Sequence, residues 1–224
     1  STRRVVKIAE RYDKKIHVLH VTTKEEVDFL AMHKKNVTFE TTPQHLTLYA
    51  PDCYDKLGTY AQMNPPLRSK DHYDRLWVAI KNNIVDVLGS DHAPHLKKNK
   101  DKKYPNTPSG MPGVQTIFPV MIDHVNNGKL ELSQLINLMC ENPCKIFGIK
   151  NKGFIKEGFD ADLTIVDMDK EVTIKNEMIA SKCGWTPFHN YKVKGFPVGT
   201  IVNGILVMSE GKILVESKGQ PLKF

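Results

Sequence analysis

Short apolar runs alternate with helical patterns through the first part of the chain, and this alternation constrains the fold more than any other feature. The runs at residues 16–21, 37–41 and 84–89 have the length and the β-branched content of buried strands. Amphipathic patterns typical of helices lie between them, over residues 24–35 and 71–82. Strands that alternate with helices at this spacing predict βα units and a parallel sheet, so we expect an α/β fold.

The remainder of the chain changes in character. Helical patterns cover residues 116–126 and 132–140, and from residue 153 onward short β-type runs are separated by Gly and charged residues. These runs lie at residues 161–166, 172–174, 200–202 and 205–208. We therefore expect two domains, with βα units over residues 1–148 and a small β-rich domain over residues 149–224.

Three βα units cannot close a barrel. A closed α/β barrel needs eight strands and roughly 250 residues, whereas this chain has 224 residues. Three parallel strands alone would leave two apolar sheet edges exposed. The chain has no initiator Met and opens inside a helical pattern. We therefore expect the C-terminal portion of a larger protein, whose N-terminal portion is supplied by another chain or has been lost.

Composition argues against several classes of function. The formal net charge is +7, but the lysines are spread along the chain, and the dense run Lys97–Lys103 has no interleaved aromatic residues for base stacking. We expect that run to be a solvated, mobile loop, and we expect no nucleic-acid partner. No apolar run reaches the roughly 18 residues that span a membrane, and we expect no signal peptide. We expect a cytoplasmic protein with buried, reduced cysteines and no membrane contact.

A loop rich in Pro and Gly is expected over residues 50–69.

A carboxylate and two imidazoles follow the third apolar run. Asp91 stands just beyond the strand predicted at residues 84–89, where a carboxylate would be costly to bury without a partner. The C-terminal tips of parallel strands are where α/β barrels carry out their chemistry. A bound metal or an exchangeable proton would explain Asp91, whereas the ordinary alternative is a carboxylate that caps a helix. His92 and His95 flank a rigid Ala-Pro pair beside it.

Two histidines mark the first apolar run. His17 and His20 are three residues apart, and on a strand such residues point to opposite faces, so only one of them can face a barrel mouth. His20 lies nearer the C-terminal tip and precedes Thr22 and Thr23, which makes it the candidate metal ligand. The alternative is a buried histidine whose hydrogen bonds are satisfied within the fold.

Two further segments offer polar groups to a ligand. Asn64 precedes two prolines, which remove backbone freedom and pre-organise an amide that can donate and accept hydrogen bonds. The alternative for Asn64 is an ordinary Asn-Pro turn. Ser109 and Gly110 precede Met-Pro-Gly, where a glycine-rich backbone can approach a ligand closely.

Taken together, these segments resemble the dihydroorotases of the amidohydrolase superfamily, and in particular the longer class I type. The matching segments are His20–Lys24, Thr42–Leu46, Met63–Arg68, Ser90–His95 and Gly158–Asp162. Their order and spacing match the C-terminal half of such an enzyme over essentially the whole chain. The Met-Asn-Pro-Pro-Leu-Arg segment separates this family from allantoinases and hydantoinases, which share the Asp-His corner.

The resemblance implies a fold and a reaction. The fold is the C-terminal part of a (β/α)8 metal-dependent hydrolase barrel plus part of a small β-sandwich domain. The reaction is the reversible cyclisation of a small molecule, N-carbamoyl-L-aspartate, to L-dihydroorotate in de novo pyrimidine biosynthesis. Zinc, as two ions in the complete enzyme, would activate water and polarise the amide carbonyl.

The resemblance also implies a role for each candidate residue. His20 would be a metal ligand, and Asp91 would be both a metal ligand and the catalytic proton shuttle. Asn64 and His95 would bind the substrate. The backbone of Ser109 and Gly110 would contact it as well.

The chain departs from the family in what it lacks. No His-x-His segment occurs, so the two ligands that the family draws from its first strand are missing, as are the bridging carboxylate and the fifth-strand His. Gln44 stands where many relatives have a histidine. His20 and Asp91 cannot hold a zinc pair, because even one catalytic zinc usually takes three protein ligands. We expect activity only together with the N-terminal half of the same enzyme. A homodimer and a contact with aspartate transcarbamoylase are further partners that the resemblance implies.

Two other functions stay open. One is a non-catalytic dihydroorotase-like subunit that scaffolds a partner enzyme, against which the presence of Asp91, Asn64 and His95 argues, because a scaffold has no chemical need for them. The other is a different cyclic-amide hydrolase, against which the Pro-Pro-Leu-Arg segment argues.

Overall fold

The computed structural model describes residues 1–215 and 219–224, and the chain forms two compact units. The first unit holds residues 1–118 and 174–191, and the second holds residues 119–173 and 192–224. The candidate site residues all belong to the first unit.

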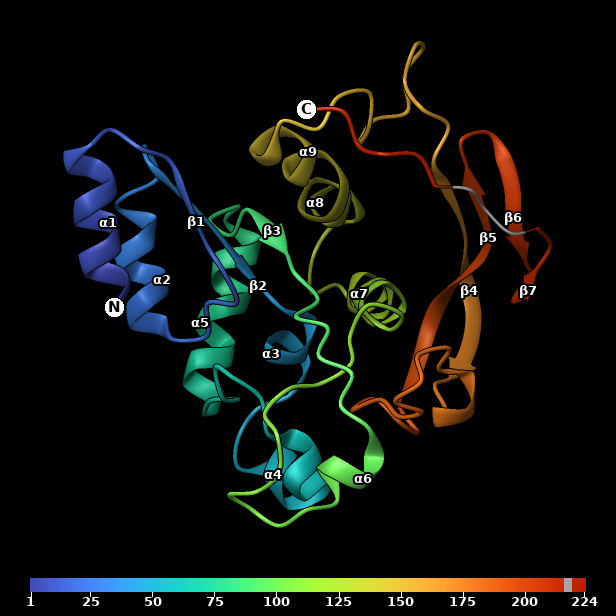
Figure 1. The fold of residues 1–224 in the computed structure, drawn as a ribbon, viewed down its shortest axis with the longest axis horizontal. Helices are drawn as coiled ribbons and strands as arrows, with labels where there is room; N and C mark the ends of the chain where they lie inside the picture. The colour runs from blue at the N-terminus through green and yellow to red at the C-terminus, as the bar shows by residue number, and fades with distance from the viewer. Residues whose placement is uncertain (216–218) are drawn as a thin grey trace. The chain divides into compact units, whose positions relative to one another are not determined.

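The first unit contains a parallel sheet with the strand order β1-β2-β3 (Figure 1). Its strands are β1 (Ile16–Val18), β2 (Val37–Thr41) and β3 (Val87–Leu88). Helix α2 (Lys24–Ala31) connects β1 to β2, and helix α5 (Lys70–Lys81) precedes β3 and packs against α2. The βα organisation and the parallel sheet that the sequence predicts are confirmed.

Local signals in the sequence explain both helices. The hydroxyl of Thr23 accepts a hydrogen bond from the Glu26 backbone N–H at 3.3 Å and caps the N-terminus of α2. Apolar residues three or four apart then face the core. The buried residues of α2 and α5 are Val27, Leu30, Leu76, Trp77, Ala79 and Ile80.

The unit also contains several short helical elements. They are α1 (Thr2–Arg11), α3 (Pro43–Thr47), α4 (Asp52–Leu57), α6 (Lys97–Lys100) and the 3₁₀ turns η1 (Gly58–Ala61) and η3 (Asn176–Met178). The prediction of a loop over residues 50–69 is therefore wrong in part, because α4 and η1 lie within it. Cys53, Leu57 and Ala61 recur every four residues and pack in a cluster with Met63 and Trp185, so burial of this stripe stabilises helix within a Pro-rich segment.

Two of the predicted strands are shorter than expected. The first ends at Val18, because the backbone leaves the strand before His20, whose φ is +40°. The third pairs only at Val87–Leu88. Immediately before it, the Asp86 N–H donates to the Phe39 carbonyl at 3.0 Å, and the Asp86 carboxylate accepts from the Phe39 N–H at 2.8 Å. The Asp86 carboxylate thus takes the place of one backbone carbonyl as the hydrogen-bond acceptor between β2 and the segment that leads into β3.

The prediction of a solvated loop at Lys97–Lys103 is wrong for Lys100. Residues 97–100 form α6, and the Lys100 side chain is completely buried although Lys97 and Lys98 are exposed. The high formal charge of the run favours a solvated loop, but Lys100 faces the interior.

The second unit joins helices to an antiparallel sheet with the order β4-β5-β6-β7. Its elements are α7 (Ile117–Asn126, which begins at the end of the first unit), α8 (Leu132–Ile136), the π-helical turn η2 (Asn137–Glu141), α9 (Asn142–Phe147), β4 (Leu163–Thr173), β5 (Lys192–Val202), β6 (Ile205–Ser209) and β7 (Lys212–Ile213). The β-type runs predicted at residues 161–166 and 172–174 belong to one long strand, β4, whose pairing is interrupted by register shifts.

Two side chains of this unit differ in their exposure. His124 is 6% exposed, and burial lowers its pKa to about 4. Cys140 was expected to be buried, but it is exposed, whereas Cys53 and Cys183 of the first unit are buried. In the described part of the chain, no helix has both the length and the apolar character that crossing a membrane requires.

Candidate functional site

His20 and Asp91 share an unusual backbone conformation at the C-terminal ends of parallel strands. Their φ angles are +40° and +41°, in a region that residues other than Gly adopt rarely and that recurs at functional sites. His20 follows β1, and Asp91 follows β3. Because the strands are parallel, both residues lie at the same edge of the sheet, with strand axes roughly 10 Å apart across β2.

The two histidines of the first strand differ in their partners. His17 Nδ1 lies 2.8 Å from the Thr38 hydroxyl, and His17 Nε2 lies 3.3 Å from a Glu40 carboxylate oxygen. His20 Nδ1 is buried and has no hydrogen-bond partner among the residues that the structure describes. A buried ring nitrogen without a partner carries a desolvation penalty, so His20 fits the role of a ligand whose counterpart lies outside the described chain.

The Asp91 carboxylate is half-buried and equally without a partner in the described residues. The residues around it are held firmly. The Gln44 amide donates to the Ser90 carbonyl at 3.0 Å, and His92 Nδ1 accepts from the Gly113 N–H at 3.0 Å. The backbone on both sides of Asp91 is therefore fixed while its oxygens stay available.

His20 and Asp91 by themselves do not make up a metal site. No group of three or more His, Cys, Asp and Glu side chains able to hold a metal occurs in the described residues. One imidazole and one carboxylate are suitable zinc donors, but a catalytic zinc usually takes three protein ligands. The donor set fits zinc in kind and falls short of it in number.

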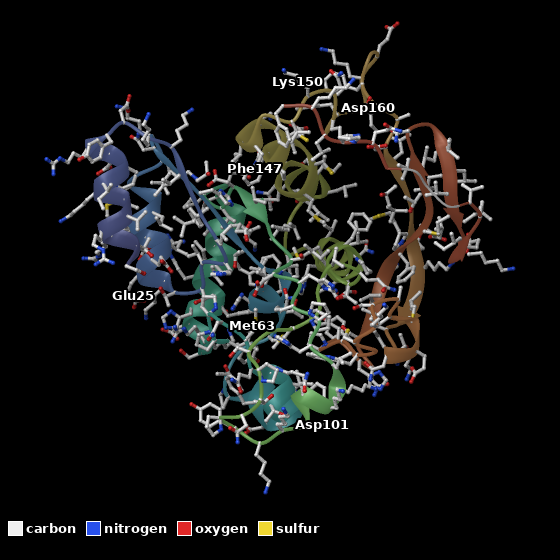
Figure 2. The ribbon with its side chains drawn as sticks, viewed as in Figure 1. Glu25, Met63, Asp101, Phe147, Lys150 and Asp160 are labelled. Atoms are coloured by element: carbon white, nitrogen blue, oxygen red, sulfur yellow. The ribbon has the colours of Figure 1, made fainter. Side chains whose placement is uncertain are left out.

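The segment Met63–Arg68 lies between two pockets of the first unit. Pro65 and Arg68 line a pocket of about 680 Å³ together with His20. Asn64 lines a second pocket of about 690 Å³ together with Gln62 and Ser109. Figure 2 labels Met63, which is buried at the start of this segment.

A buried histidine holds this segment in place. His45 Nε2 lies 3.0 Å from the Pro65 carbonyl, and His45 Nδ1 lies 2.8 Å from the Thr42 hydroxyl. A carbonyl can only accept, so Nε2 carries the proton and Nδ1 accepts from Thr42. Burial lowers the pKa of His45 to about 4, which keeps the ring neutral and this pattern intact at neutral pH.

His95, Ser109 and Gly110 contact one another. His95 Nε2 donates to the Ser109 carbonyl at 2.9 Å, and the Gly110 N–H donates to the Gln62 carbonyl at 3.0 Å. Gly110 has a φ of +134°, and a Cβ there would lie 2.5 Å from the Ala93 Cβ. Because Gly110 has no side chain, its backbone packs closely against Ala93 and His95.

Sequence reasoning did not single out Arg68, Gln62, Lys100 or Trp185 as site residues. Arg68 lines the same pocket as His20. It ends the Met63–Arg68 segment, so that segment could have indicated it as a site residue. Trp185 Nε1 donates to the His95 carbonyl at 2.7 Å from 90 residues away, and no local pattern could have indicated that contact.

Comparison with known proteins gives a consistent result. The sequence model of the amidohydrolase family matches residues 3–207. A dihydroorotase from Pyrococcus furiosus is 39% identical over 221 residues, which are 98% of this chain and 51% of that protein. A dihydroorotase from Pyrococcus abyssi is 38% identical, with 98% of this chain and 52% of that protein covered.

Among solved structures, an L-hydantoinase (dihydropyrimidinase) from Arthrobacter aurescens is similar over 99% of this chain and 51% of its own, with a TM-score of 0.93 and 33% identity. The chain therefore spans about half the length of the curated relatives and of the solved structure that it matches.

Proposed function

Because the chain belongs to the amidohydrolase family, we propose that it supplies the C-terminal half of a zinc-dependent dihydroorotase. An N-terminal half completes the active site, which interconverts N-carbamoyl-L-aspartate and L-dihydroorotate in pyrimidine synthesis. The observation that carries the proposal is the pair His20 and Asp91, unpartnered at one sheet edge and each in a left-handed backbone conformation. Relatives named dihydroorotase at up to 39% identity support the choice of reaction.

The residues of this chain have separate roles in the proposed reaction. His20 and Asp91 are two of the zinc ligands, and the metal when bound supplies an activated water and polarises the amide carbonyl. In hydrolysis, oxygen from water adds to the ring carbonyl carbon, the ring C–N bond breaks, and the leaving nitrogen gains a proton. Asp91 accepts the proton from water and delivers it to that nitrogen. In the cyclisation direction the same carboxylate moves the proton back.

Substrate binding falls to groups around the two pockets. The Asn64 side chain is exposed in its pocket and offers an amide to the ring. His95 donates its Nε2–H to the Ser109 carbonyl, and as an imidazolium it would also offer Nδ1–H to the substrate carboxylate. Ser109 lines the same pocket as Asn64, and the Ser109 carbonyl and the Gly110 N–H are already bonded within the chain.

The open edge of β1 supports a complementing half. Within the described residues, β1 has β2 on one side and no strand on the other. A pocket of about 680 Å³ lies beside β1 and is lined by residues 16–20 and by Val5 of α1. Leu19 and Val5 are 55% and 46% exposed there, and an exposed apolar strand edge is a template for pairing with another chain. A homodimer of the assembled enzyme and a transcarbamoylase partner stay predictions from the family resemblance.

A different cyclic-amide hydrolase is the second candidate, because the solved structure with a TM-score of 0.93 is an L-hydantoinase. Both reactions open a cyclic amide, so they share the metal, the proton shuttle and the water. They differ in whether the substrate carries a carboxylate. Arg68 and His95 offer positive charge or hydrogen bonds to such a group, which favours the carboxylate-bearing substrate.

The test is a fused enzyme. The N-terminal half of the Pyrococcus furiosus dihydroorotase would be joined to this chain, loaded with zinc, and assayed with dihydroorotate, hydantoin and dihydrouracil. Turnover of dihydroorotate, abolished in the folded Asp91→Asn variant, is the expected result. Preference for hydantoin or dihydrouracil would establish the second candidate instead. A folded, zinc-loaded fusion that turns over none of the three would support the scaffold alternative.

A further inference from the structure

Lys100 is a buried lysine that pairs with backbone carbonyls instead of with a carboxylate. Its side chain is 0% exposed at the end of α6. Its Nζ donates to the Gln62 carbonyl at 3.1 Å and to the Pro108 carbonyl at 2.9 Å. No salt bridge engages it in the part of the chain that the structure describes, and burial lowers its pKa to about 8.

The two carbonyls belong to the two segments that carry the candidate substrate-binding residues. Gln62 lies two residues before Asn64, and Pro108 lies directly before Ser109. The Gln62 carbonyl also accepts from the Gly110 N–H at 3.0 Å, and the Gln62 amide donates to the Ser109 hydroxyl at 3.1 Å. The Lys100 ammonium group, the Gln62 side-chain amide and one backbone hydrogen bond thus join the two segments.

Lys100 also contacts the residue that fixes His95. Its Nζ lies 5.7 Å from the centroid of the Trp185 ring, within the range of a cation–π interaction. Trp185 Nε1 donates to the His95 carbonyl at 2.7 Å. Ser109, Gly110 and His95 are therefore each linked to Lys100 through one intermediate residue, and Asn64 lies two residues after Gln62 in the same segment.

The base of the Lys100 side chain is anchored as well. Its backbone carbonyl accepts from the hydroxyls of Thr59 at 2.7 Å and Thr107 at 3.3 Å. The next residue, Asp101, accepts from the Tyr60 hydroxyl at 2.6 Å, and Figure 2 shows it beside α6. The backbone at the base of the side chain is thereby held in place at the same time as the ammonium group binds its two carbonyls.

Stability alone does not account for a lysine at this position. Burying an ammonium group without a carboxylate is costly, and an apolar side chain of similar length would fill the same space. A lysine differs in that its three N–H donors can hold two carbonyls and the face of an aromatic ring together.

We propose that Lys100 is a positioning residue that holds the segments of Asn64 and Ser109–Gly110 at the separation that substrate binding requires. The inference rests on the proposed function, and it deepens that function by assigning a residue to substrate affinity. Lys100 touches neither the metal ligands nor the reacting atoms, so its loss affects binding of the substrate more than the chemical step.

The test compares Lys100→Met with Lys97→Met in the zinc-loaded fusion. Lys97 lies three residues earlier on the same helix and is exposed, so it is a matched control for loss of charge. Lys100→Met should raise KM for dihydroorotate at least tenfold with kcat changed by less than about threefold, whereas Lys97→Met should change neither. Equal KM values in the two folded variants would overturn the proposal, as would a loss confined to kcat.

Hydrogen exchange on this chain alone separates the inference from the proposed function. Amide exchange over residues 58–66 and 104–112 should accelerate at least tenfold in Lys100→Met and stay unchanged in Lys97→Met. If the fusion is inactive with dihydroorotate, the proposed function fails while exchange still decides whether Lys100 holds the segments. If Lys100→Met does not fold, Lys100→Gln, which keeps two donors on a shorter side chain, takes its place. Unchanged exchange in the folded variant would contradict the proposal.

Discussion

At the scale of single residues, the candidate site combines positive backbone φ angles with polar side-chain atoms that lack partners among the described residues. His20, Asp91 and Gly110 all have positive φ angles, although only one of them is a glycine. Positive φ at other residue types is tolerated where the surrounding structure imposes it. The three positions lie at strand ends or in a loop that the chain packs tightly, which is where functional geometry has to be imposed.

Gly110→Ala should destabilise the first unit by about 2 kcal/mol or more, because the new Cβ meets the Ala93 Cβ at 2.5 Å and the φ of +134° is unsuited to Ala. Gly184→Ala is the matched control in the same unit. Its φ is +66°, but nothing lies within 4 Å of the new Cβ, so it should lose only about 1 kcal/mol. Urea denaturation of each variant measures the difference, and equal losses would show that no steric contact constrains Gly110.

His45 should make the fold sensitive to acid. Its pKa is about 4 in the folded chain because of burial, against about 6.5 when unfolded. The unfolded state therefore binds more protons between these values, so stability is fully present above pH 6.5 and is lost as the pH falls towards 4. The full loss from this group is about 3 kcal/mol. Unfolding free energies measured across this range should show the slope, and His45→Gln should reduce it. Replacing the exposed His189 should leave the slope unchanged, and a slope that His45→Gln retains would exclude His45 as its source.

At the scale of elements, periodic patterns were predictable and contacts between distant segments were not. The helix predicted over residues 71–82 is α5 at Lys70–Lys81, because its apolar residues recur with helical spacing. The helix α4 was missed, because Pro and Gly nearby favour a loop while its stripe is buried by partners such as Met111 and Trp185, far away in sequence. Lys100 was placed in solvent for the same reason, since the carbonyls that bind it come from outside its own segment.

The junction between β2 and β3 depends on one carboxylate. Asp86→Ala removes the acceptor of the buried Phe39 N–H and the ion-pair partner of Lys34. A backbone donor left without an acceptor in the core should lower the unfolding free energy by about 2 kcal/mol. Asp28→Ala breaks the exposed ion pair with Arg75. This control should change the unfolding free energy by less than about 1 kcal/mol. Thermal or urea unfolding of both variants provides the check, and similar values would mean that the ladder does not need Asp86.

At the scale of the whole molecule, the sequence predicts a site that an N-terminal half has to complete, and this stays a prediction. The described residues contain no group of three or more metal-capable side chains, although the sheet that presents His20 and Asp91 is formed. The α/β class and the match to the amidohydrolase family were predictable from the order of motifs. The roles of the individual site residues stay predictions, because neither the fold nor the relatives test them.

Zinc binding should therefore depend on assembly. The chain alone offers two ligands and should lose zinc on gel filtration, whereas the fusion with the N-terminal half should retain it stoichiometrically. Metal analysis of both proteins after gel filtration measures this directly. Stoichiometric zinc on the chain alone would mean that further ligands, such as water or an additional side chain, complete a site within it.

Assembly itself should depend on the open edge of β1. Leu19 is 55% exposed and lines the pocket along that strand, so Leu19→Lys places a charge where a complementing strand has to pair and pack. Burying an unpaired ammonium there is unfavourable, and the affinity for a separately produced N-terminal half of the Pyrococcus furiosus enzyme should fall at least tenfold. Met32→Lys is the control, because Met32 is 76% exposed at the end of α2, away from the pocket. Binding measured by calorimetry should be the same for Met32→Lys and the unaltered chain. If Leu19→Lys binds equally well, the N-terminal half docks on another surface of the chain, and the open edge of β1 is not its binding site.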